Sequence, residues 1–70
     1  MTEDEFLAVV RSVREIGDPS SLDLPVAETV LDSLDLAVLR SSLEVRLGRP
    51  IHDEVWTGAR SLRELLDALQ

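Results

Sequence analysis

Apolar residues recur at spacings of three and four in three stretches of the chain, and this pattern limits the fold more than any other feature. The stretches cover residues 3–16, 33–47 and 62–69. In an α-helix, residues at this spacing gather on one face, which can then be buried. The stretches therefore predict three amphipathic helices. Their apolar faces are formed by Phe6, Val9, Val10, Val13 and Ile16, by Leu36, Leu39, Leu43 and Leu47, and by Leu62, Leu65, Leu66 and Leu69.

The ends of the first stretch carry typical helix signals. Thr2 can cap the N-terminus, since its hydroxyl can accept a hydrogen bond from a free backbone N–H group. Gly17 suits the C-cap, and Pro19 prevents the helix from continuing. We therefore expect a first helix from residue 3 to residue 16.

The second and third stretches are marked in the same way. Asp32 stands just before the second helix and can form a capping box with Asp35 three residues later, and Gly48 suits the C-terminus of the helix. Ser61 and Glu64 form a second capping box before the last helix. The second helix is expected from Ser33 to Leu47.

Residues 17–31 form a long connection between the first two helices. Leu22, Leu24 and Val26 alternate with other residues, but a lone strand would have no partner. We therefore predict an ordered loop that these three apolar side chains pin to the core. A connection this long in a compact domain usually contains a short helical turn or has a function.

Residues 51–56 predict one further short helix, which Gly58 would break. The predicted architecture is all-α: a four-helix bundle of three main helices and one short helix, with a long loop between the first two. Residues 1–70 are expected to form one domain. The chain has no cysteine, so its core must hold without disulfides.

Charge and composition exclude several classes of function. Fourteen acidic against seven basic residues give a net charge of −7, which argues against binding to nucleic acid phosphates and is compatible with a basic protein partner. The N-terminal segment MTEDEF is too acidic for a targeting signal, and no apolar run is long enough for membrane insertion. We expect a cytoplasmic monomer.

Ser33 is the residue with the clearest functional potential. As a serine before an apolar helix it could be a simple cap. At a helix N-terminus, however, a phosphate ester on its hydroxyl would also be stabilised by the free N–H groups and the helix dipole. His52 is the one histidine, and no pattern connects it with Ser33 as a catalytic base. The chain is therefore not expected to be an enzyme or to bind a metal.

The segment DSLD, residues 32–35, resembles the attachment motif of the acyl carrier proteins. The order of the predicted helices is similar to that of the family, and so is the segment LRSSLEVRLGRPIHDEVWTGARSLRELLDAL over residues 39–69. The resemblance covers nearly the whole chain. It departs before the motif, where Val30 stands in place of the usual Gly and Thr29 in place of the usual Leu.

The resemblance implies that Ser33 holds a 4′-phosphopantetheine arm, with Asp32, Leu34 and Asp35 as its motif neighbours. A phosphopantetheinyl transferase would attach the arm from coenzyme A with magnesium. The thiol of the arm would then carry an acyl group as a thioester to acyl-loading and synthase enzymes of fatty acid, polyketide or related specialised-metabolite biosynthesis. The carrier itself would catalyse nothing and would work as a free-standing protein.

In this family the second helix is the usual surface for partner recognition. The resemblance places Asp35, Ala37, Val38, Ser41 and Glu44 on that surface. Few of these residues are acidic, so we expect a recognition surface that is more apolar than is common for carriers of fatty acid synthesis. The same positions could equally be a solvated helix face.

Trp56 is expected to plug the hydrophobic core or to cover it as a lid. The other interpretation is that Trp56 lines a cleft that takes up the acyl chain, as in some carriers.

Two other functions remain open at this point. A peptidyl or aminoacyl carrier of a nonribosomal peptide pathway would use the same serine, although its motif more often has Gly-Gly before Ser. A small acidic helical adaptor would never be modified, and Ser33 would then be only a cap.

Overall fold

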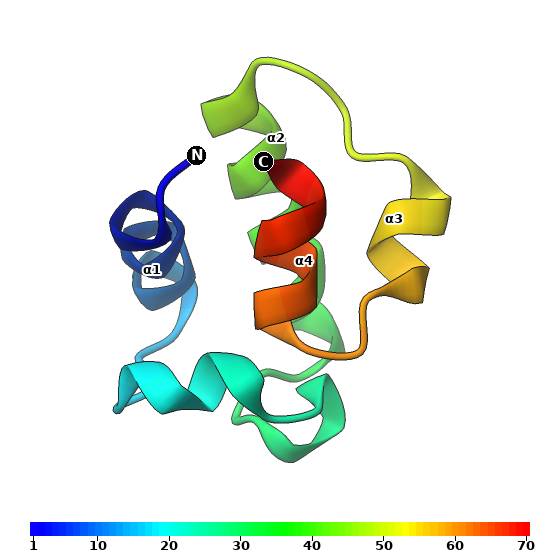
Figure 1. Ribbon diagram of the computed structural model, residues 1–70. Helices are drawn as coiled ribbons and strands as arrows, with labels where there is room; N and C mark the ends of the chain where they lie inside the picture. Colours follow the sequence, from blue (N-terminus) through cyan, green and yellow to red (C-terminus); the bar gives the residue numbers. More distant parts are fainter.

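The structure is a computed structural model that describes residues 1–70, and it confirms an all-α fold (Figure 1). The four α-helices are α1 (Glu3–Val13), α2 (Ser33–Leu47), α3 (Asp53–Gly58) and α4 (Leu62–Leu69). Two 3₁₀ helices, η1 (Pro19–Asp23) and η2 (Val26–Glu28), lie in the long connection. Helices α1, α2 and α4 form the bundle, and α3 lies to one side against α4.

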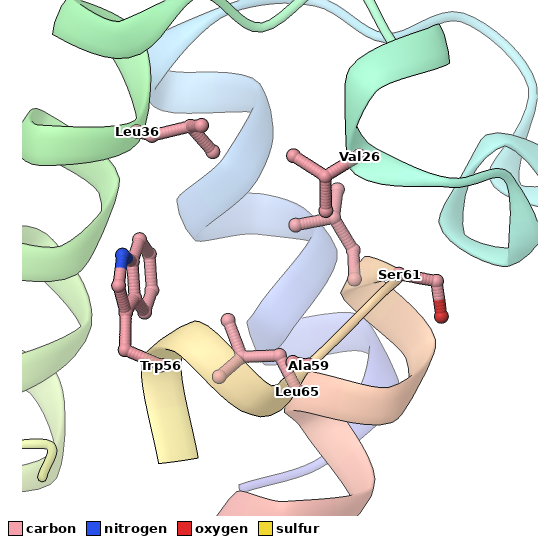
Figure 2. Close-up of a pocket in the computed structure, with 7 residues that line it drawn as sticks. Val26, Leu36, Trp56, Ala59, Ser61 and Leu65 are labelled. Atoms are coloured by element: carbon pink, nitrogen blue, oxygen red, sulfur yellow. The ribbon is translucent and has the colours of Figure 1, made fainter. Parts of the chain in front are cut away.

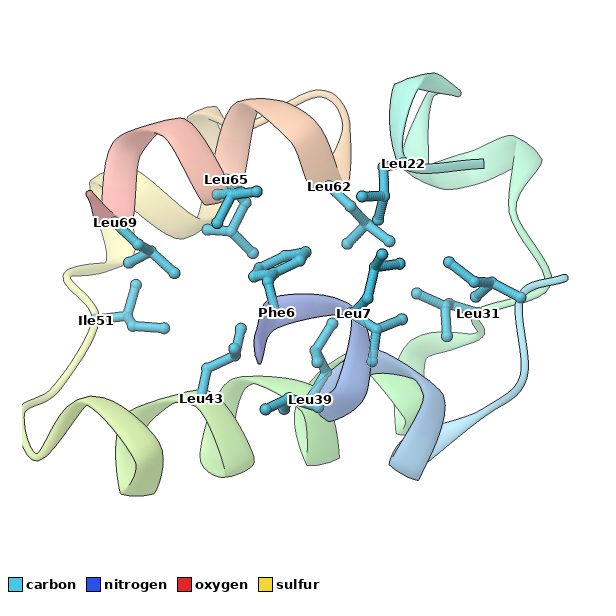
Figure 3. Packing of buried hydrophobic residues seen from close by; sticks show 14 residues of the cluster. Phe6, Leu7, Leu22, Leu31, Leu39, Leu43, Ile51, Leu62, Leu65 and Leu69 are labelled. Atoms are coloured by element: carbon cyan, nitrogen blue, oxygen red, sulfur yellow. The ribbon is translucent and has the colours of Figure 1, made fainter. Parts of the chain in front are cut away.

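The core is aliphatic and has one aromatic residue at its centre. Phe6 of α1 is completely buried and lies among leucines of α2 and α4 (Figure 3). Leu39 and Leu43 of α2 are also completely buried, as their helical spacing predicts. The side chains that form this core come from α1, α2, α4, η1 and the connections: Phe6, Leu7, Val9, Val10, Ile16, Leu22, Leu31, Leu39, Leu43, Ile51, Leu62, Leu65, Leu66 and Leu69.

Helix α1 is shorter than its apolar pattern predicts. It ends at Val13, and Arg14 already has an extended backbone with φ −160°. The predicted C-cap is therefore wrong: Gly17 lies in the following turn with φ +77°. The helix ends early because Arg14 turns toward α2, where its guanidinium binds Asp35. Ile16 is still buried, although it lies outside the helix.

The N-terminus of α1 is capped as predicted. The Thr2 hydroxyl accepts a hydrogen bond from the backbone N–H of Glu5, and the Glu5 carboxylate accepts one from the backbone N–H of Thr2. Two of the free donors at the helix end are thereby satisfied.

The long connection is ordered by its two 3₁₀ helices. Leu22 of η1 is completely buried, and the backbone N–H of Val26 donates to the carbonyl of Arg60 just before α4. The prediction that Leu24 also reaches the core is wrong, since its side chain is 43% exposed. Leu24 follows η1 in an extended conformation, so its side chain does not continue the inward face of that short helix.

Helix α2 has the bounds that the sequence predicts. Asp32 and Asp35 form the capping box, and Gly48 ends the helix in the left-handed conformation with φ +72°. At α4 the box is only half formed: the Ser61 hydroxyl accepts from the N–H of Glu64, but the Glu64 carboxylate accepts from the N–H of Arg60.

Helix α3 begins and ends two residues later than predicted, at Asp53 and Gly58. Gly58 is its last residue and does not break it. Ile51 precedes the helix and is buried in the core, so the chain is anchored before α3 begins.

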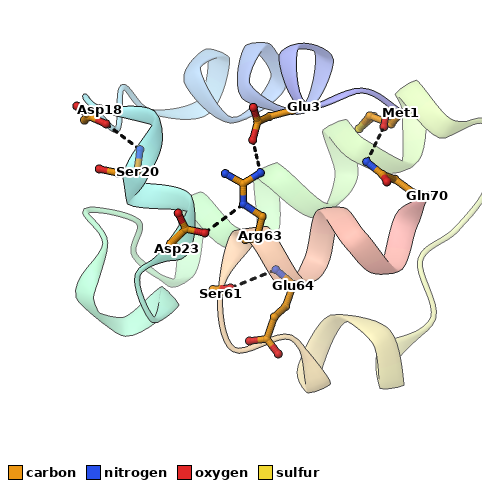
Figure 4. Close-up of polar contacts among 9 residues, drawn as sticks. All are labelled: Met1, Glu3, Asp18, Ser20, Asp23, Ser61, Arg63, Glu64 and Gln70. Atoms are coloured by element: carbon orange, nitrogen blue, oxygen red, sulfur yellow. Dashed lines mark hydrogen bonds and ion pairs between the residues drawn. The ribbon is translucent and has the colours of Figure 1, made fainter.

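Arg63 joins three elements on the surface of the bundle. From α4 its guanidinium pairs with Glu3 of α1 and with Asp23 of η1 (Figure 4). The two ends of the chain are also adjacent, since the side-chain amide of Gln70 donates to the carbonyl of Met1. Helices α1 and α4 are therefore held together at their surface as well as in the core.

Candidate functional site

Ser33 is the first residue of α2, and its side chain is exposed to solvent. The cap of this helix is Asp32, whose carboxylate accepts from the N–H of Asp35 at 2.8 Å. The Asp35 carboxylate in turn accepts from the N–H of Asp32 at 3.2 Å. Because the two aspartates complete the capping box, the Ser33 hydroxyl takes no part in it. The helix does not need this serine as a cap, and its hydroxyl is free for other chemistry.

Arg14 neutralises one of the two carboxylates beside Ser33. Its Nε donates to Oδ2 of Asp35 at 2.6 Å, across the gap between α1 and α2. The hydrogen bond from Arg14, together with the one from the backbone of Asp32, lowers the pKa of Asp35 below its ordinary value of 3.8. A negative group on Ser33 would therefore face a paired carboxylate at Asp35. No sequence pattern predicts that Arg14 pairs with Asp35, because the two residues are 21 positions apart along the chain.

The structure separates the residues that the resemblance assigns to partner recognition into two groups. Ala37, Val38 and Ser41 are exposed on α2. Asp35 and Glu44 are engaged within the chain. The Glu44 carboxylate accepts from the backbone N–H of Ile51 at 2.7 Å. The exposed face of α2 therefore has fewer free charges than its sequence suggests.

A second apolar face of α2 lies opposite the core. Leu34, Val38 and Val45 are 73%, 46% and 83% exposed. They follow one another at spacings of four and seven residues, which places them on one side of the helix. We call these three residues the outer stripe of α2. The sequence contains this spacing as well, but the leucine pattern of the inner face is stronger, and the sequence prediction of the recognition surface does not include Val45.

A small cavity of about 90 Å³ lies between α2, η2, α3 and the start of α4. Leu36, Trp56 and Val26 face the same space from three different elements (Figure 2). Leu36 lies about one helical turn beyond Ser33 on α2. The cavity is therefore apolar and close to the exposed hydroxyl. Its remaining walls are Ala59, Ser61, Leu62 and Leu65.

Trp56 is a wall of this cavity and lies at the edge of the core. Its side chain is half-buried and packs against the hydrophobic cluster without belonging to it. The Arg40 guanidinium lies 5.7 Å from the centre of its ring, within the range of a cation–π contact. Trp56 is therefore not a plug inside the core: it covers the edge of the core, as the expected lid would, and it also lines the cavity. His52 precedes α3, is exposed and makes no capping bond with its side chain.

Comparison with known proteins adds no relative: no protein-family model, no curated protein and no solved structure matches the chain. None of the helices combines the length and the apolar character that crossing a membrane requires.

Proposed function

We propose that this protein is an acyl carrier protein in which Ser33 holds a 4′-phosphopantetheine arm. The observation that carries the proposal is the position of Ser33: an exposed hydroxyl at the N-terminus of the longest helix, with the cap supplied by its neighbours Asp32 and Asp35. Such a hydroxyl can be esterified without a loss of helix stability.

The surroundings of Ser33 suit a phosphate ester. The free N–H groups and the dipole at the start of α2 favour a negative charge there. Arg14 pairs with Asp35 and so reduces the repulsion that two bare aspartates would cause. When attached, the arm supplies the thiol that forms the thioester, and the chain has no cysteine of its own to compete with it.

The cavity between α2 and α3 is where we place a short acyl chain. Its walls are mainly apolar, and Leu36 lies one turn from the attachment point. An apolar cavity of about 150 Å³ holds one benzene molecule, so 90 Å³ suits about three or four carbons. Burial there would shield a short chain from water.

The outer stripe of α2 is where we place the partner enzymes. It begins at Leu34, directly beside Ser33, and continues along the helix to Val45. A transferase or synthase that binds this stripe would have the arm within reach. In this proposal the chain is a cytoplasmic monomer that presents its cargo and catalyses nothing.

Intact-mass measurement after incubation with coenzyme A, magnesium and a broad-specificity phosphopantetheinyl transferase tests the proposal. We expect the parent chain to gain the mass of one phosphopantetheine and Ser33→Ala to gain none. Ser20→Ala, which removes an exposed serine of η1, is the matched control and should gain it like the parent.

The same experiment separates the alternatives. If the folded parent gains no mass with several transferases, the carrier proposal is wrong and the adaptor becomes the better explanation. If it gains the arm, loading with an adenylating enzyme and amino acids distinguishes a peptidyl carrier from an acyl carrier. Loading by amino acids but not by acyl groups would contradict the acyl assignment.

A further inference from the structure

The segment before α3 is held against α2 by two side chains of that helix. Arg40 Nη2 donates to the carbonyl of Ile51 at 2.6 Å, and Glu44 Oε2 accepts from the N–H of the same residue at 2.7 Å. Arg40 and Glu44 are four residues apart on α2, and Arg40 Nε lies 3.8 Å from Glu44 Oε2. Both the N–H and the carbonyl group of Ile51 are thus hydrogen-bonded to side chains on one face of α2.

Arg40 makes two further contacts with α3 itself. Its Nη2 lies 2.5 Å from Oδ1 of Asp53, and its guanidinium lies over the ring of Trp56. The pair with Asp53 is exposed and contributes little by itself, whereas the bond to the Ile51 carbonyl is half-buried. The side chain of Arg40 therefore contacts this region at three points: the Ile51 carbonyl just before α3, Asp53 at its first residue, and the ring of Trp56.

Helix α3 has few other contacts: within it, Val55 and Trp56 pack only partly buried against the hydrophobic core. It is six residues long, and none of its residues is fully buried. It packs against α4, and the hydrogen bonds that join α2 to α3 or to Ile51 just before it all come from Arg40 or Glu44. A short helix with few buried contacts belongs to the low-stability part of a fold and can open locally.

The distance between α2 and α3 sets the width of the cavity. Leu36 of α2 and Trp56 of α3 are two of its walls (Figure 2). If α3 moved away from α2, the cavity would widen between these two side chains. Arg40 lies one turn beyond Leu36 on α2 and contacts Trp56, so it opposes this movement.

We propose that Arg40 determines the chain length that the cavity accepts, because it holds α3 against α2 and so limits the space to about three or four carbons. This inference rests on the proposed function for its cargo. The holding of α3 by Arg40 can be measured without an arm.

The first experiment measures hydrogen exchange in the unmodified chain. In Arg40→Gln, the amides of Val55 and Trp56, which donate to the His52 carbonyl, should exchange about tenfold faster than in the parent. The amides of α1 and α4 should be unchanged. Arg46→Gln is the matched control, since Arg46 is exposed on the same helix and its loss changes the net charge equally. If the amides of α3 exchanged at the same rate in Arg40→Gln and in Arg46→Gln, the proposal would be overturned.

The second experiment loads parent and variants with butyryl and octanoyl groups and follows Trp56 fluorescence. For each variant, the emission of the acyl-loaded form is compared with that of the same variant carrying the arm without an acyl group. This comparison removes the direct effect of Arg40 on the fluorescence of Trp56. In the parent, butyryl should shift the emission and octanoyl should not. In Arg40→Gln, octanoyl should shift it as well. Arg40→Lys keeps the charge but lacks the planar guanidinium that reaches Ile51, Asp53 and Trp56 together. Its response to octanoyl should lie between those of the parent and Arg40→Gln, and it serves if Arg40→Gln does not fold.

The outcomes separate this inference from the proposed function. No gain of the arm means that the carrier proposal fails, and the cargo selectivity fails with it. A normal gain of the arm with the same chain-length preference in the parent and in Arg40→Gln means that the carrier stands and the role of Arg40 is wrong.

Discussion

Asp35 shows how one side chain can serve two elements at once. Its carboxylate completes the cap of α2 and also accepts the hydrogen bond from Arg14 at the end of α1. The first role is local and the second is tertiary. Together they engage within the chain an acid that the resemblance assigns to partner recognition.

The Arg14–Asp35 pair should make the stability of the fold depend on pH. The pKa of Asp35 is lowered in the folded chain, so its contribution is present above the ordinary value of 3.8 and is lost as the pH falls through the lower, folded value. Asp35→Asn should therefore be less stable than the parent at pH 7 and should lose less stability on acidification. Urea unfolding followed between about pH 7 and pH 2 checks this. Parallel profiles for parent and variant would contradict it.

Leu43 and Val45 are close in sequence but opposite in environment. Leu43 is completely buried, so Leu43→Ala should lower the free energy of unfolding by about 2–5 kcal/mol. Val45 is 83% exposed, so Val45→Ala should change it by no more than about 0.5 kcal/mol. Denaturant unfolding of both variants is the measurement. Similar losses would mean that the two faces of α2 are wrongly assigned.

Helix α2 has two apolar faces with different tasks. The inner face, with Leu39 and Leu43, packs against α1 and the rest of the core. The outer stripe of Leu34, Val38 and Val45 remains exposed to solvent. Exposed apolar residues that line up along a helix, rather than lying scattered, are typical of an interaction surface.

Binding to the outer stripe should be mainly apolar. Val38→Gln should raise the KM of the transferase several-fold, since about 1 kcal/mol of apolar burial would be lost. Raising the salt concentration should weaken binding only moderately, because Asp35 and Glu44 are engaged within the chain. Ala8→Gln, on the exposed face of α1, is the control. A steep salt dependence, or no effect of Val38→Gln, would contradict this surface.

The molecule as a whole carries more negative charge than its ion pairs neutralise. The net charge is −7, and most of the fourteen acids have no arginine within ion-pair distance. Arg63 offsets part of this where α1, η1 and α4 meet. Unpaired charges of one sign repel one another and destabilise a compact state.

Salt should therefore stabilise the fold. Raising the ionic strength from about 0.01 M to about 0.15 M shortens the screening length from about 30 Å to about 8 Å, which is less than the width of this molecule. Screening should reduce the repulsion between the unpaired acids by more than it weakens the exposed ion pairs. The midpoint temperature of thermal unfolding should therefore rise with salt. A midpoint that falls with sodium chloride would show that the ion pairs outweigh the repulsion.

The sequence was sufficient where the relevant interactions are local. Helix periodicity, the capping box of Asp32 and Asp35, and the left-handed Gly48 involve residues a few positions apart, and these predictions are confirmed. Local signals failed at the end of α1 and at Leu24. At the end of α1 the outcome depended on the contact between Arg14 and Asp35 of α2, which no short segment contains. At Leu24 it depended on where η1 ends, because Leu24 follows that helix in an extended conformation.

The sequence by itself determined that the chain is helical, that α2 runs from Ser33 to Leu47 and that Ser33 stands at its start, because hydrogen bonds within one helix decide these features. Only the tertiary structure decided that Arg14 neutralises Asp35, that Arg40 fastens α3, and that Leu36 and Trp56 line the same cavity. The partners in each case lie on different helices, and packing of the core brings them together.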